Sequence, residues 1–390
     1  MASKVAILLL ALGHLEVAQS LAKPEPGECL APTYMTRFSA KLFQVMMKLE
    51  DQDGNVSLSP FAVHAMLALI YRASEGETLS EVQRVGEFNQ HPVFVALDFE
   101  RLIKFKEHLQ SAKLNSYSRV FYNQKLGKVN SRYDEFSKFY FHIDTKPVHM
   151  DGGEDTARWL PFWIQSSGIS SQMQAILTNN MIFEGFWKHQ FALRNTRFSE
   201  FHLASGETKN VAMMHNHEVY GLADLPELDA TALELPFNDS ATSMLILLPN
   251  QLDGLANLEQ QLAQPEFDLN RIANRLHRQS VAVSLPKFST DSDIDMTDAL
   301  KMLGLRQMFT DSSKVTKLLD RPVRVDKILQ RSSIFVTEQG TVYSHFLANE
   351  RSLPANSKEF VANRPFVFVI RTPNSVLLMG HIKRLWNYGP

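Results

Sequence analysis

The sequence predicts an α+β fold built as one large domain. Three observations support this class: apolar residues recur at helical spacing near the N-terminus, strand-like runs dominate the later part, and no repeat or clear linker divides the chain. The chain has 390 residues, of which 44% are hydrophobic and 21% charged. This is the composition of an ordinary globular protein.

The first twenty residues are organised like a secretory signal. Lys4 supplies a positive start, residues 5–12 an apolar stretch, and Ala18-Gln-Ser20 small residues for cleavage. We therefore expect a signal peptide at 1–20, a flexible N-terminal segment at 21–30, a single domain at 31–390, and a secreted, extracellular protein. A buried N-terminal helix is the alternative interpretation. The chain after this stretch contains no run of 18 apolar residues, so no membrane-spanning helix is predicted.

Helical signals dominate the next segment. An amphipathic helix is predicted by the spacing of five apolar positions: Met35, Phe38, Leu42, Val45 or Met46, and Leu49. A short strand is predicted at 55–59, and Pro60 is suited to open the helix that follows it. Thr78 with Glu81 three residues later has capping-box spacing and predicts the start of another helix.

Strand signals dominate the remainder. Apolar or β-rich runs at 118–122, 181–183 and 242–248 predict strands, as does the alternation of Val281, Val283 and Leu285. A short helix is expected at 298–305. Near the C-terminus, a strand from Ile334 ends in Gly-Thr, and a second apolar strand is predicted at 360–370. About two dozen irregular residues separate them, and loops of that length are usually functional.

Charge and cysteine content limit the partners. The net charge of −2 implies no attraction to nucleic acid, and we expect no membrane association. Cys29 is the only cysteine, so the chain forms no internal disulfide. We expect a monomer in which Cys29 is a free thiol, with an intermolecular link as the alternative.

Two glycosylation sequons are present, Asn55-Val-Ser57 and Asn238-Asp-Ser240. Asn238 follows Pro236-Phe237 and precedes an apolar run, which places it in a predicted hairpin turn. Asn55 leads directly into a predicted strand. Asn238 is therefore the favoured glycosylation site, and Asn55 is expected to be unmodified.

No motif indicates an enzyme. The chain has no Gly-x-Ser-x-Gly elbow, no phosphate-binding loop and no His-Glu-x-x-His. His215-Asn-His217 could offer two imidazoles to a metal, but no third ligand is evident nearby, so incidental histidines are the favoured interpretation. We expect no catalytic residue, cofactor or metal.

The chain resembles the serpins, which inhibit proteases by inserting an exposed loop into their own β-sheet. Residues 360–370 fit the family's C-terminal signature at every position, and Glu338-Gln-Gly340-Thr341 resembles its hinge. Further landmarks follow in family order: Asn55-Val-Ser-Leu-Ser59-Pro60, Gly76-Glu-Thr78, the run from Leu177 to Trp187, Phe201-His-Leu203 with Met213-Met214, Leu285-Pro-Lys-Phe288, and Leu303-Gly304-Leu305.

The resemblance implies a fold, a partner and a site. The fold would be a large central mixed β-sheet with two smaller sheets, about eight or nine helices, and a reactive loop at about 340–362. The partner would be a serine protease that cleaves the loop and is trapped when the hinge inserts. The hinge residues would be Glu338, Gly340, Thr341, Val342, Tyr343, Ser344, His345 and Phe346.

The bond that the protease cuts has two candidates. Loop length places it at Pro354-Ala355 by the family's spacing, although proline suits few serine proteases before the cut. Arg351-Ser352 is the better trypsin-like target but lies three residues early. The sequence leaves both candidates open.

The hinge departs from the family pattern. Successive residues of a strand alternate faces, so one face would carry Thr341, Tyr343, His345, Leu347, Asn349 and Arg351. Inhibitory members have mostly alanine-like residues here, and extra bulk in a packed interior costs ~1–3 kcal/mol per site. We therefore expect weak or lost trapping, with a substrate-like, decoy or non-inhibitory role. The alternatives are an active inhibitor of a trypsin-like or other serine protease, and a ligand carrier or chaperone.

The family positions that control sheet opening also differ. They fall on Ser59, Ala62, Asn179, Trp187 and Gln330. Ala62 replaces a serine and Gln330 replaces a histidine, whereas Ser59 and Asn179 match the family. Pro161 replaces the tryptophan of a helix that covers the sheet, so that helix is expected to be kinked or to begin there.

Some serpins bind heparin through a basic helix, but here we expect basic residues to be solvated and no heparin-like polyanion to bind.

Overall fold

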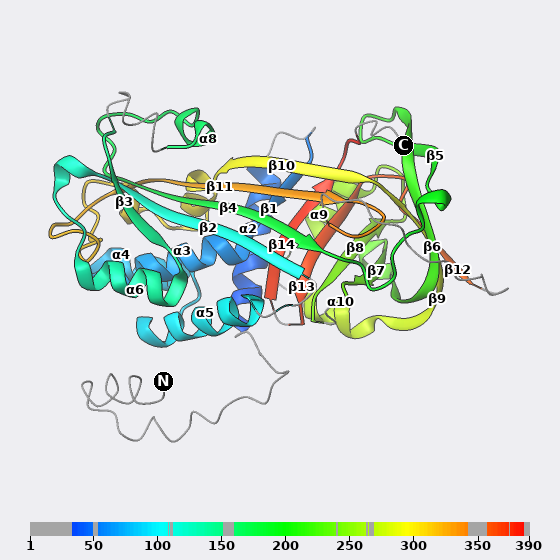
Figure 1. Ribbon diagram of the computed structural model, residues 1–390, viewed down its shortest axis with the longest axis horizontal. Coiled ribbons are helices and arrows are strands. Elements are labelled where there is room, and N and C mark those ends of the chain that lie inside the picture. The colour runs from blue at the N-terminus through cyan, green and yellow to red at the C-terminus, as the bar shows by residue number, and fades with distance from the viewer. Residues whose placement is uncertain are drawn as a thin grey trace, which may run out of the picture. The chain divides into compact units, whose positions relative to one another are not determined.

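A computed structural model describes residues 33–49, 54–107, 109, 112–150, 160–238, 241–262, 264, 269–341, 357–373 and 375–385. All of them belong to one compact unit, Ala31–Pro390. The predicted signal peptide, the segment with Cys29 and loop positions 342–356 lie outside the described residues. The described part folds into two β-sheets with nine α-helices, which is the α+β class that the sequence predicts (Figure 1).

Six helices come from the first half of the chain: α2 (Thr33–Leu49), α3 (Pro60–Ala73), α4 (Gly76–Val85), α5 (Pro92–Glu107), α6 (Ser131–Phe141) and α8 (Phe162–Gln165). Three follow later: α9 (Leu255–Leu262), α10 (Leu269–Arg275) and α11 (Thr297–Met302). The predicted amphipathic helix is α2, although Leu49 is 44% exposed and lies outside its buried face. No helix in these ranges is long and apolar enough to cross a membrane.

The starts of α3 and α4 test two helix-capping predictions, of which one is confirmed and one is wrong. At α3, Ser59 caps the helix, because its hydroxyl accepts from the Ala62 N–H and Pro60 occupies the first turn, as predicted. At α4 the predicted capping box is wrong, since the helix begins at Gly76 and Thr78 lies inside it. The Thr78 hydroxyl instead accepts from Lys314 N–H, and Glu81 accepts from the backbone at Arg306.

The five-stranded sheet is mixed and lies across the molecule (Figure 1). Its order is β10 (Phe288–Asp295), β11 (Val325–Val336), β4 (Ala175–Gly185), β2 (Ala112–Asn123) and β3 (Asp144–Val148). β11 and β4 pair in parallel at its centre, with antiparallel β10 and β2 on either side. α3 and α5 contact this sheet from one side. The strands predicted at 118–122 and 181–183 lie in the C-terminal halves of the longer β2 and β4.

The nine-stranded sheet follows the order β1 (Val56–Leu58), β14 (Ser375–Ile382), β13 (Phe366–Thr372), β8 (Ser243–Pro249), β7 (Ala230–Pro236), β6 (Thr208–Leu225), β9 (His277–Pro286) and β12 (Lys358–Val361), with β5 (Arg197–His202) also paired to β6. The resemblance predicted two smaller sheets. Here they form one continuous sheet, because the 18-residue strand β6 pairs with strands of both predicted sheets. The single strand predicted at 360–370 is divided into β12 and β13 by residues 362–365.

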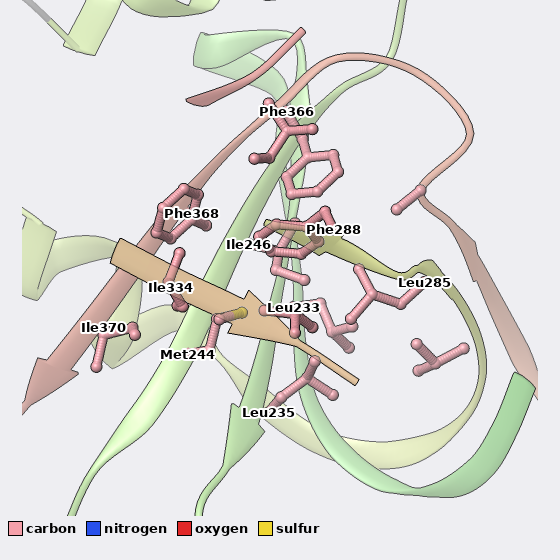
Figure 2. Close-up of a cluster of buried hydrophobic side chains, with 14 of the residues drawn as sticks. Leu233, Leu235, Met244, Ile246, Leu285, Phe288, Ile334, Phe366, Phe368 and Ile370 are labelled. Atoms are coloured by element: carbon pink, nitrogen blue, oxygen red, sulfur yellow. The ribbon is translucent and has the colours of Figure 1, made fainter. Parts of the chain in front are cut away.

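The main core lies between the two sheets (Figure 2). The Phe288 ring of β10 contacts the rings of Phe366 and Phe368 on β13, with centroids 5.5 and 5.7 Å apart. Ile334 of β11 and Ile246 of β8 are buried beside them. The core therefore supports β11, the strand that leads into the loop.

Candidate functional site

A tight turn follows β11 and begins the predicted hinge. The Thr337 N–H donates to Gly340 O at 2.8 Å, and the Gly340 N–H donates back to Thr337 O at 3.2 Å. Gly340 has φ +147°, and a Cβ there would lie 1.9 Å from Gly185 O. Glycine is therefore required at this position by both conformation and close approach.

Beyond the turn, the chain begins to pair with the end of β4. The Thr341 N–H donates to Gly185 O at 2.7 Å, and the Trp187 N–H donates to Gln339 O at 2.8 Å. Between these two bonds, Phe186 faces Gly340 as an antiparallel pair. Thr341 is only 1% exposed. The hinge thus starts at the seam between β11 and β4, antiparallel to both strands.

Glu338 anchors this turn from below the surface. Its carboxylate lies 3.2 Å from Lys287 Nζ and accepts a 2.8 Å hydrogen bond from the Thr196 hydroxyl. Its backbone oxygen accepts from the Phe191 N–H at 2.8 Å. Both charged side chains are less than a tenth exposed, so the pair is nearly buried. A buried charge that loses its partner is costly, which couples the turn to the strands beneath it.

Trp187 holds the turn from its other side. The indole N–H donates to Thr337 O at 3.0 Å, and the ring stacks on Phe237 with centroids 4.6 Å apart. Phe237 in turn contacts Phe183 of β4. Trp187, one of the positions that the resemblance assigned to sheet opening, thus lies at the predicted hinge.

In the middle of the seam, Gln330 of β11 joins the two strands to α3. Its amide N–H donates to Asn179 Oδ1 at 3.2 Å and to Ser59 O at 3.1 Å, and its Oε1 accepts from the Ser59 N–H at 2.7 Å. The Ser59 hydroxyl donates to Leu377 O at 2.6 Å. Ala62 lies beside this network and contributes its N–H to Ser59 Oγ.

The network extends across the sheet through Asn179. Its amide donates to the hydroxyls of Ser116 and Ser118 on β2, both at 2.9 Å. Four of the five predicted opening positions therefore meet in one buried cluster, and Trp187 lies apart from them at the hinge. A glutamine amide supplies both a donor and an acceptor, which lets Gln330 bond Ser59 twice.

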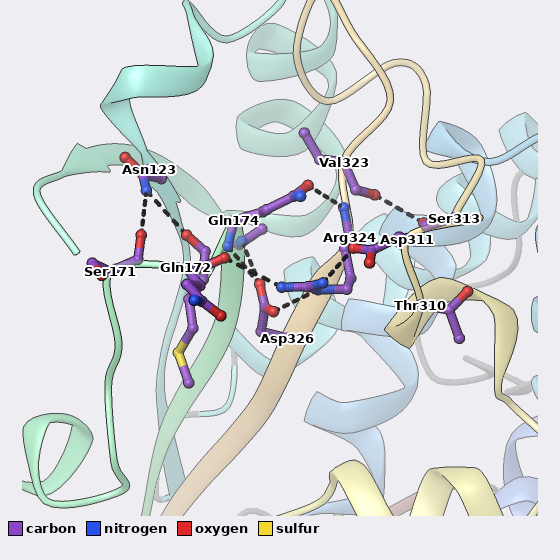
Figure 3. A network of polar contacts seen from close by, with 12 residues as sticks. Asn123, Ser171, Gln172, Gln174, Thr310, Asp311, Ser313, Val323, Arg324 and Asp326 are labelled. Atoms are coloured by element: carbon purple, nitrogen blue, oxygen red, sulfur yellow. Dashed lines mark hydrogen bonds and ion pairs between the residues drawn. The ribbon is translucent and has the colours of Figure 1, made fainter. Parts of the chain in front are cut away.

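A second polar network closes the far end of the seam (Figure 3). Asp326 Oδ2 accepts from the N–H groups of Gln174 and Ala175, at 2.5 and 3.2 Å, and Oδ1 accepts from Arg324 Nε at 2.7 Å. Arg324 also donates to Gln172 O at 3.2 Å and pairs with Asp311. Side chains and backbone from both strands thus meet at the end opposite the hinge.

The exposed face of β10 and β11 carries a separate set of ion pairs. Arg331 binds Asp291 through two nitrogens, at 2.7 and 3.2 Å, and lies 3.6 Å from Asp293. Lys327 Nζ lies 2.8 Å from an oxygen of Asp295. Salt bridges therefore link β11 to β10, on the side of β11 away from β4.

The two histidines lie on β6 and are engaged by protein groups. Arg197 Nε donates to His215 Nε2 at 3.1 Å, so His215 Nδ1 donates to Ser284 Oγ at 2.8 Å. Burial first, and then the Arg197 charge, hold the pKa of His215 below its usual value. His217 Nε2 lies 2.9 Å from Ser280 Oγ. Within the described ranges, no three metal-ligating side chains come together.

The two sequon asparagines differ in environment. Asn55 Nδ2 donates to Arg384 O at 2.7 Å, and Oδ1 accepts from the N–H groups of Lys383 and Arg384. Asn238 is exposed after β7, in the predicted turn before β8, and its N–H donates to Phe186 O at 2.8 Å. Asp239 and Ser240 lie outside the described residues.

The remaining predictions concern α8 and the basic residues. α8 starts directly after Pro161, so the proline begins this helix and does not kink it. Lys106 is 5% exposed and lies over the Phe61 ring, and Arg275 pairs with Glu227, so neither stands as an isolated surface charge.

Several residues of the site were not predicted from sequence. Lys287 stood within the quoted Leu285-Pro-Lys-Phe288 run, but nothing in that run indicates its distant partner Glu338. Arg324 lies just before β11 and Asp326 near its start, and their i, i+2 spacing gives no sequence signal for contacts with Gln172 and Gln174. The candidate scissile positions and residues 342–346 of the hinge lie outside the described residues.

Comparison with known proteins places this geometry in a family. A family model described as "Serpin (serine protease inhibitor)" matches residues 33–385. The chain is 26% identical to the leukocyte elastase inhibitor of Bos taurus, over 89% of this chain and 97% of that protein.

Solved structures share the fold. Serpin48 of the insect Tenebrio molitor, a highly specific serpin, superposes with a TM-score of 0.80 at 23% identity, covering 93% of this chain and all of the other. Native protease nexin-1, solved with heparin, gives 0.77 at 22% identity, covering 90% and 98%.

Proposed function

The chain belongs to the serpin family, and from that membership we propose that it presents the loop after Thr341 to a serine protease that cleaves it, with slow or lost trapping of the enzyme. Most members of this family are inhibitors of proteases. The observation that carries the proposal is the pairing register at the hinge, which assigns core-facing positions to Tyr343 and His345.

The register can be continued from both sides of the seam. On the β4 side, Thr341 lies opposite Gly185, so each later loop residue would meet the preceding residue of β4. On the β11 side, Gly340 lies opposite Thr337, so the same residues would run back along β11. The two extrapolations agree, because both place position 347 between Asn179 and Gln330, which are already paired.

This register sets the neighbours of an inserted loop. Tyr343 would face Phe183 and Ile334, each 1% exposed in the core. His345 would face Met181 and Ser332, which are fully buried. Phe346, with the opposite parity, would point to the outer face of the sheet beside Asn180. Two bulky side chains would therefore enter a core that is already filled.

The cost of this fit determines the outcome. Overpacking a core costs ~1–3 kcal/mol per site, and each ~1.4 kcal/mol added to a barrier slows the step about tenfold. Insertion competes with hydrolysis of the acyl ester that forms when the protease serine attacks the scissile carbonyl and the new amine leaves. Insertion slowed at two sites favours hydrolysis, so cleaved protein and free enzyme would be the products.

The test is covalent trapping seen on a denaturing gel. Protein from Leu21 onward is incubated separately with trypsin, chymotrypsin and elastase. We expect loop cleavage with little band at the summed mass, and a large gain of that band in Tyr343→Ala/His345→Ala. Phe346→Ala is the matched control, because it removes an aromatic ring from the outer face and should leave trapping unchanged. Efficient trapping by the unmodified chain would contradict the proposal and favour the fully active inhibitor.

The same digests locate the cut. Peptide masses distinguish cleavage at Arg351-Ser352, which we expect with trypsin, from cleavage at Pro354-Ala355. A cut outside residues 342–356 with all three enzymes would contradict the assignment of the loop.

We also propose that the protein is secreted after removal of residues 1–20, which leaves the segment 21–30 and a domain at 31–390. The organisation of Lys4, the apolar stretch and Ala18-Gln-Ser20 supports this. N-terminal sequencing of protein from the medium of eukaryotic cells should begin at Leu21. Retention of the full chain inside the cells would contradict it.

A further inference from the structure

A pocket lies between the turn that joins β5 to β6 and the chain that follows β14. Its volume is about 320 Å³, at the lower end of the range for small-molecule sites. The large side chains that line it are Leu203, Glu207, Lys209, Lys383, Arg384 and Leu385. The pocket is therefore separate from the loop hinge and from the seam between β11 and β4.

Backbone hydrogen bonds hold both walls of the pocket. On one side, the Leu203 N–H donates to Glu207 O at 2.7 Å and closes the turn after β5. On the other side, Asn55 Oδ1 accepts from the N–H groups of Lys383 and Arg384, at 2.8 and 2.9 Å. A site that is formed before its ligand arrives loses less free energy to ordering on binding. This pocket is pre-formed in that sense.

The buried part of the lining is apolar. Leu203 and Leu385 are 7% and 3% exposed, and both belong to the main core between the two sheets. Side chains of a close-packed core have fixed positions, so they offer a defined apolar surface to an occupant. A ligand with an apolar body would remove this surface and its own from water, which is favourable.

The exposed part of the lining is basic. Lys209 on β6 and Arg384 are exposed, and the Lys383 side chain is 12% exposed. Glu207 is the acidic member among the described lining residues, so three positive charges and one negative charge leave an excess of +2. The whole chain has a net charge of −2. A concave surface lined by one sign of charge raises the local concentration of the opposite ion.

Lys383 supplies the least solvated of these charges. Its Nζ lies 4.0 Å from Glu259 Oε2, which is too long for a hydrogen bond. The other oxygen of Glu259 lies 2.5 Å from Nδ1 of the buried His381. An ammonium group has three N–H donors, so Lys383 can donate to an anion in the pocket while Glu259 stays beside it. Such charge-assisted hydrogen bonds are stronger than neutral ones.

We propose that this pocket binds a small organic anion that has an apolar body, such as an aryl-substituted carboxylic acid. The carboxylate lies between Lys209 and Lys383, and the apolar body lies against Leu203 and Leu385. An inorganic anion would leave the leucine surface in contact with water, and a neutral molecule would leave the basic excess uncompensated. The proposal depends neither on cleavage of the loop nor on trapping of a protease.

The test is a titration of the protein, isotope-labelled at its leucine methyl groups, with phenylbutyrate. Leu203→Met and Leu385→Met identify the two sets of methyl signals, because swaps that conserve volume are well tolerated. We expect both sets to shift and saturate, while those of Leu69, buried in α3, stay in place. Phenylbutanamide and acetate should each bind about tenfold more weakly, since one lacks the charge and the other the apolar body.

Three outcomes would overturn the proposal. Methyl signals of Leu203 and Leu385 that do not move would show that nothing enters the pocket. An amide that binds as tightly as phenylbutyrate would show that the charge has no role. Acetate that binds as tightly as phenylbutyrate would show that the apolar body has none.

Charge variants give effects of opposite sign. Lys209→Gln should weaken phenylbutyrate binding several-fold, and Glu207→Gln should strengthen it by removing a repelling charge. Lys128→Gln is the matched control, because it removes one exposed lysine from the loop before α6 and should leave the affinity unchanged. Methyl signals away from the pocket verify that each variant is folded. Equal effects of Lys209→Gln and Lys128→Gln would show a response to net charge alone and contradict the site.

Discussion

Glu338 and Lys287 form a nearly buried ion pair under the loop hinge, with 3.2 Å between Oε2 and Nζ. Glu338 belongs to the turn that follows β11, and Lys287 lies between β9 and β10. The pair therefore joins the start of the loop to the connection between the two sheets. Its geometry contributes to how firmly the turn after β11 is held.

Removing one partner should be more harmful than removing both. Glu338→Ala leaves Lys287 buried and uncompensated, which we expect to lower the free energy of unfolding by ~3–5 kcal/mol. Lys287→Met/Glu338→Met replaces both charges with apolar groups and should be far less destabilising. Urea unfolding of the three proteins measures this. A double variant as unstable as Glu338→Ala would show that the charge is not the cause.

Gly340 should tolerate no side chain. Gly340→Ala would place Cβ 1.9 Å from Gly185 O, so we expect the turn to open and the hinge to detach from β4. Gly127→Ala is the control, because φ there is also positive, at +116°, but the space around it is empty. Hydrogen exchange at the amides of Thr341 and Trp187 should accelerate in the first variant alone. Unchanged protection in Gly340→Ala would contradict this.

The middle of the seam should depend on the two-sided bonding of Gln330. Gln330→Ala leaves the Ser59 N–H and the Asn179 amide oxygen without that partner, and a buried unsatisfied group costs ~1–3 kcal/mol. An imidazole offers one donor and one acceptor, so Gln330→His should lose less. Melting temperatures should therefore rank the native chain first, the histidine variant second and the alanine variant last. Another order would mean that Gln330 acts by packing.

His64 should make stability depend on pH. Burial lowers its pKa to about 3, an effect partly opposed by its 2.8 Å hydrogen bond to Gly86 O, and the ring stacks on Phe38. Below the unfolded value near 6.5, the unfolded chain binds a proton that the native ring does not. Stability from this group is thus complete above pH 6.5 and falls as pH drops toward 3, by at most ~1.4 kcal/mol per pH unit.

Unfolding at pH 7 and pH 5 measures that dependence. His64→Gln removes the titrating ring and retains a donor for Gly86 O, so it should be less stable than the native chain at pH 7. Its disadvantage should shrink at pH 5, where the native chain has lost stability that the variant never had. A disadvantage that grows on acidification would have the wrong sign and contradict the assignment.

The family and its fold could be predicted because they depend on local signals in a fixed order. The apolar spacing from Met35 produced α2, Ser59-Pro60 produced the start of α3, and the strand before Gly340 is β11. The apolar runs at 118–122 and 181–183 marked only the C-terminal halves of β2 and β4, because the earlier residues of these strands carry no clear alternation. The capping box predicted from Thr78 and Glu81 was wrong because their side chains form hydrogen bonds with a distant segment at Arg306 and Lys314. The spacing of residues along the chain gives no information about such contacts.

The site was predicted only where the resemblance supplied positions. Ser59, Asn179 and Gln330 could be named in advance, but Gln330 was noted only as a replacement for the family's histidine. The structure shows instead that its amide bonds Ser59 twice and Asn179 once. Lys287 and Asp326 could not be found in advance, since the Glu338 partner of Lys287 and the Gln174 and Ala175 partners of Asp326 lie more than fifty residues away.

If the loop inserts as proposed, the network of Figure 3 would limit how much of it the seam can accept. Continued in register, position 351 would reach Ala175, whose N–H is bound by Asp326. An inserted strand can therefore run from Thr341 to Glu350 before it displaces Arg324 and Asp326 from Gln174. In a chain cut after Arg351, the residue that carries the attached enzyme would lie at this end of the sheet, with no further loop residues between the enzyme and the sheet. A chain cut after Pro354 would hold the enzyme on a tether three residues longer, and a longer tether transmits less distortion.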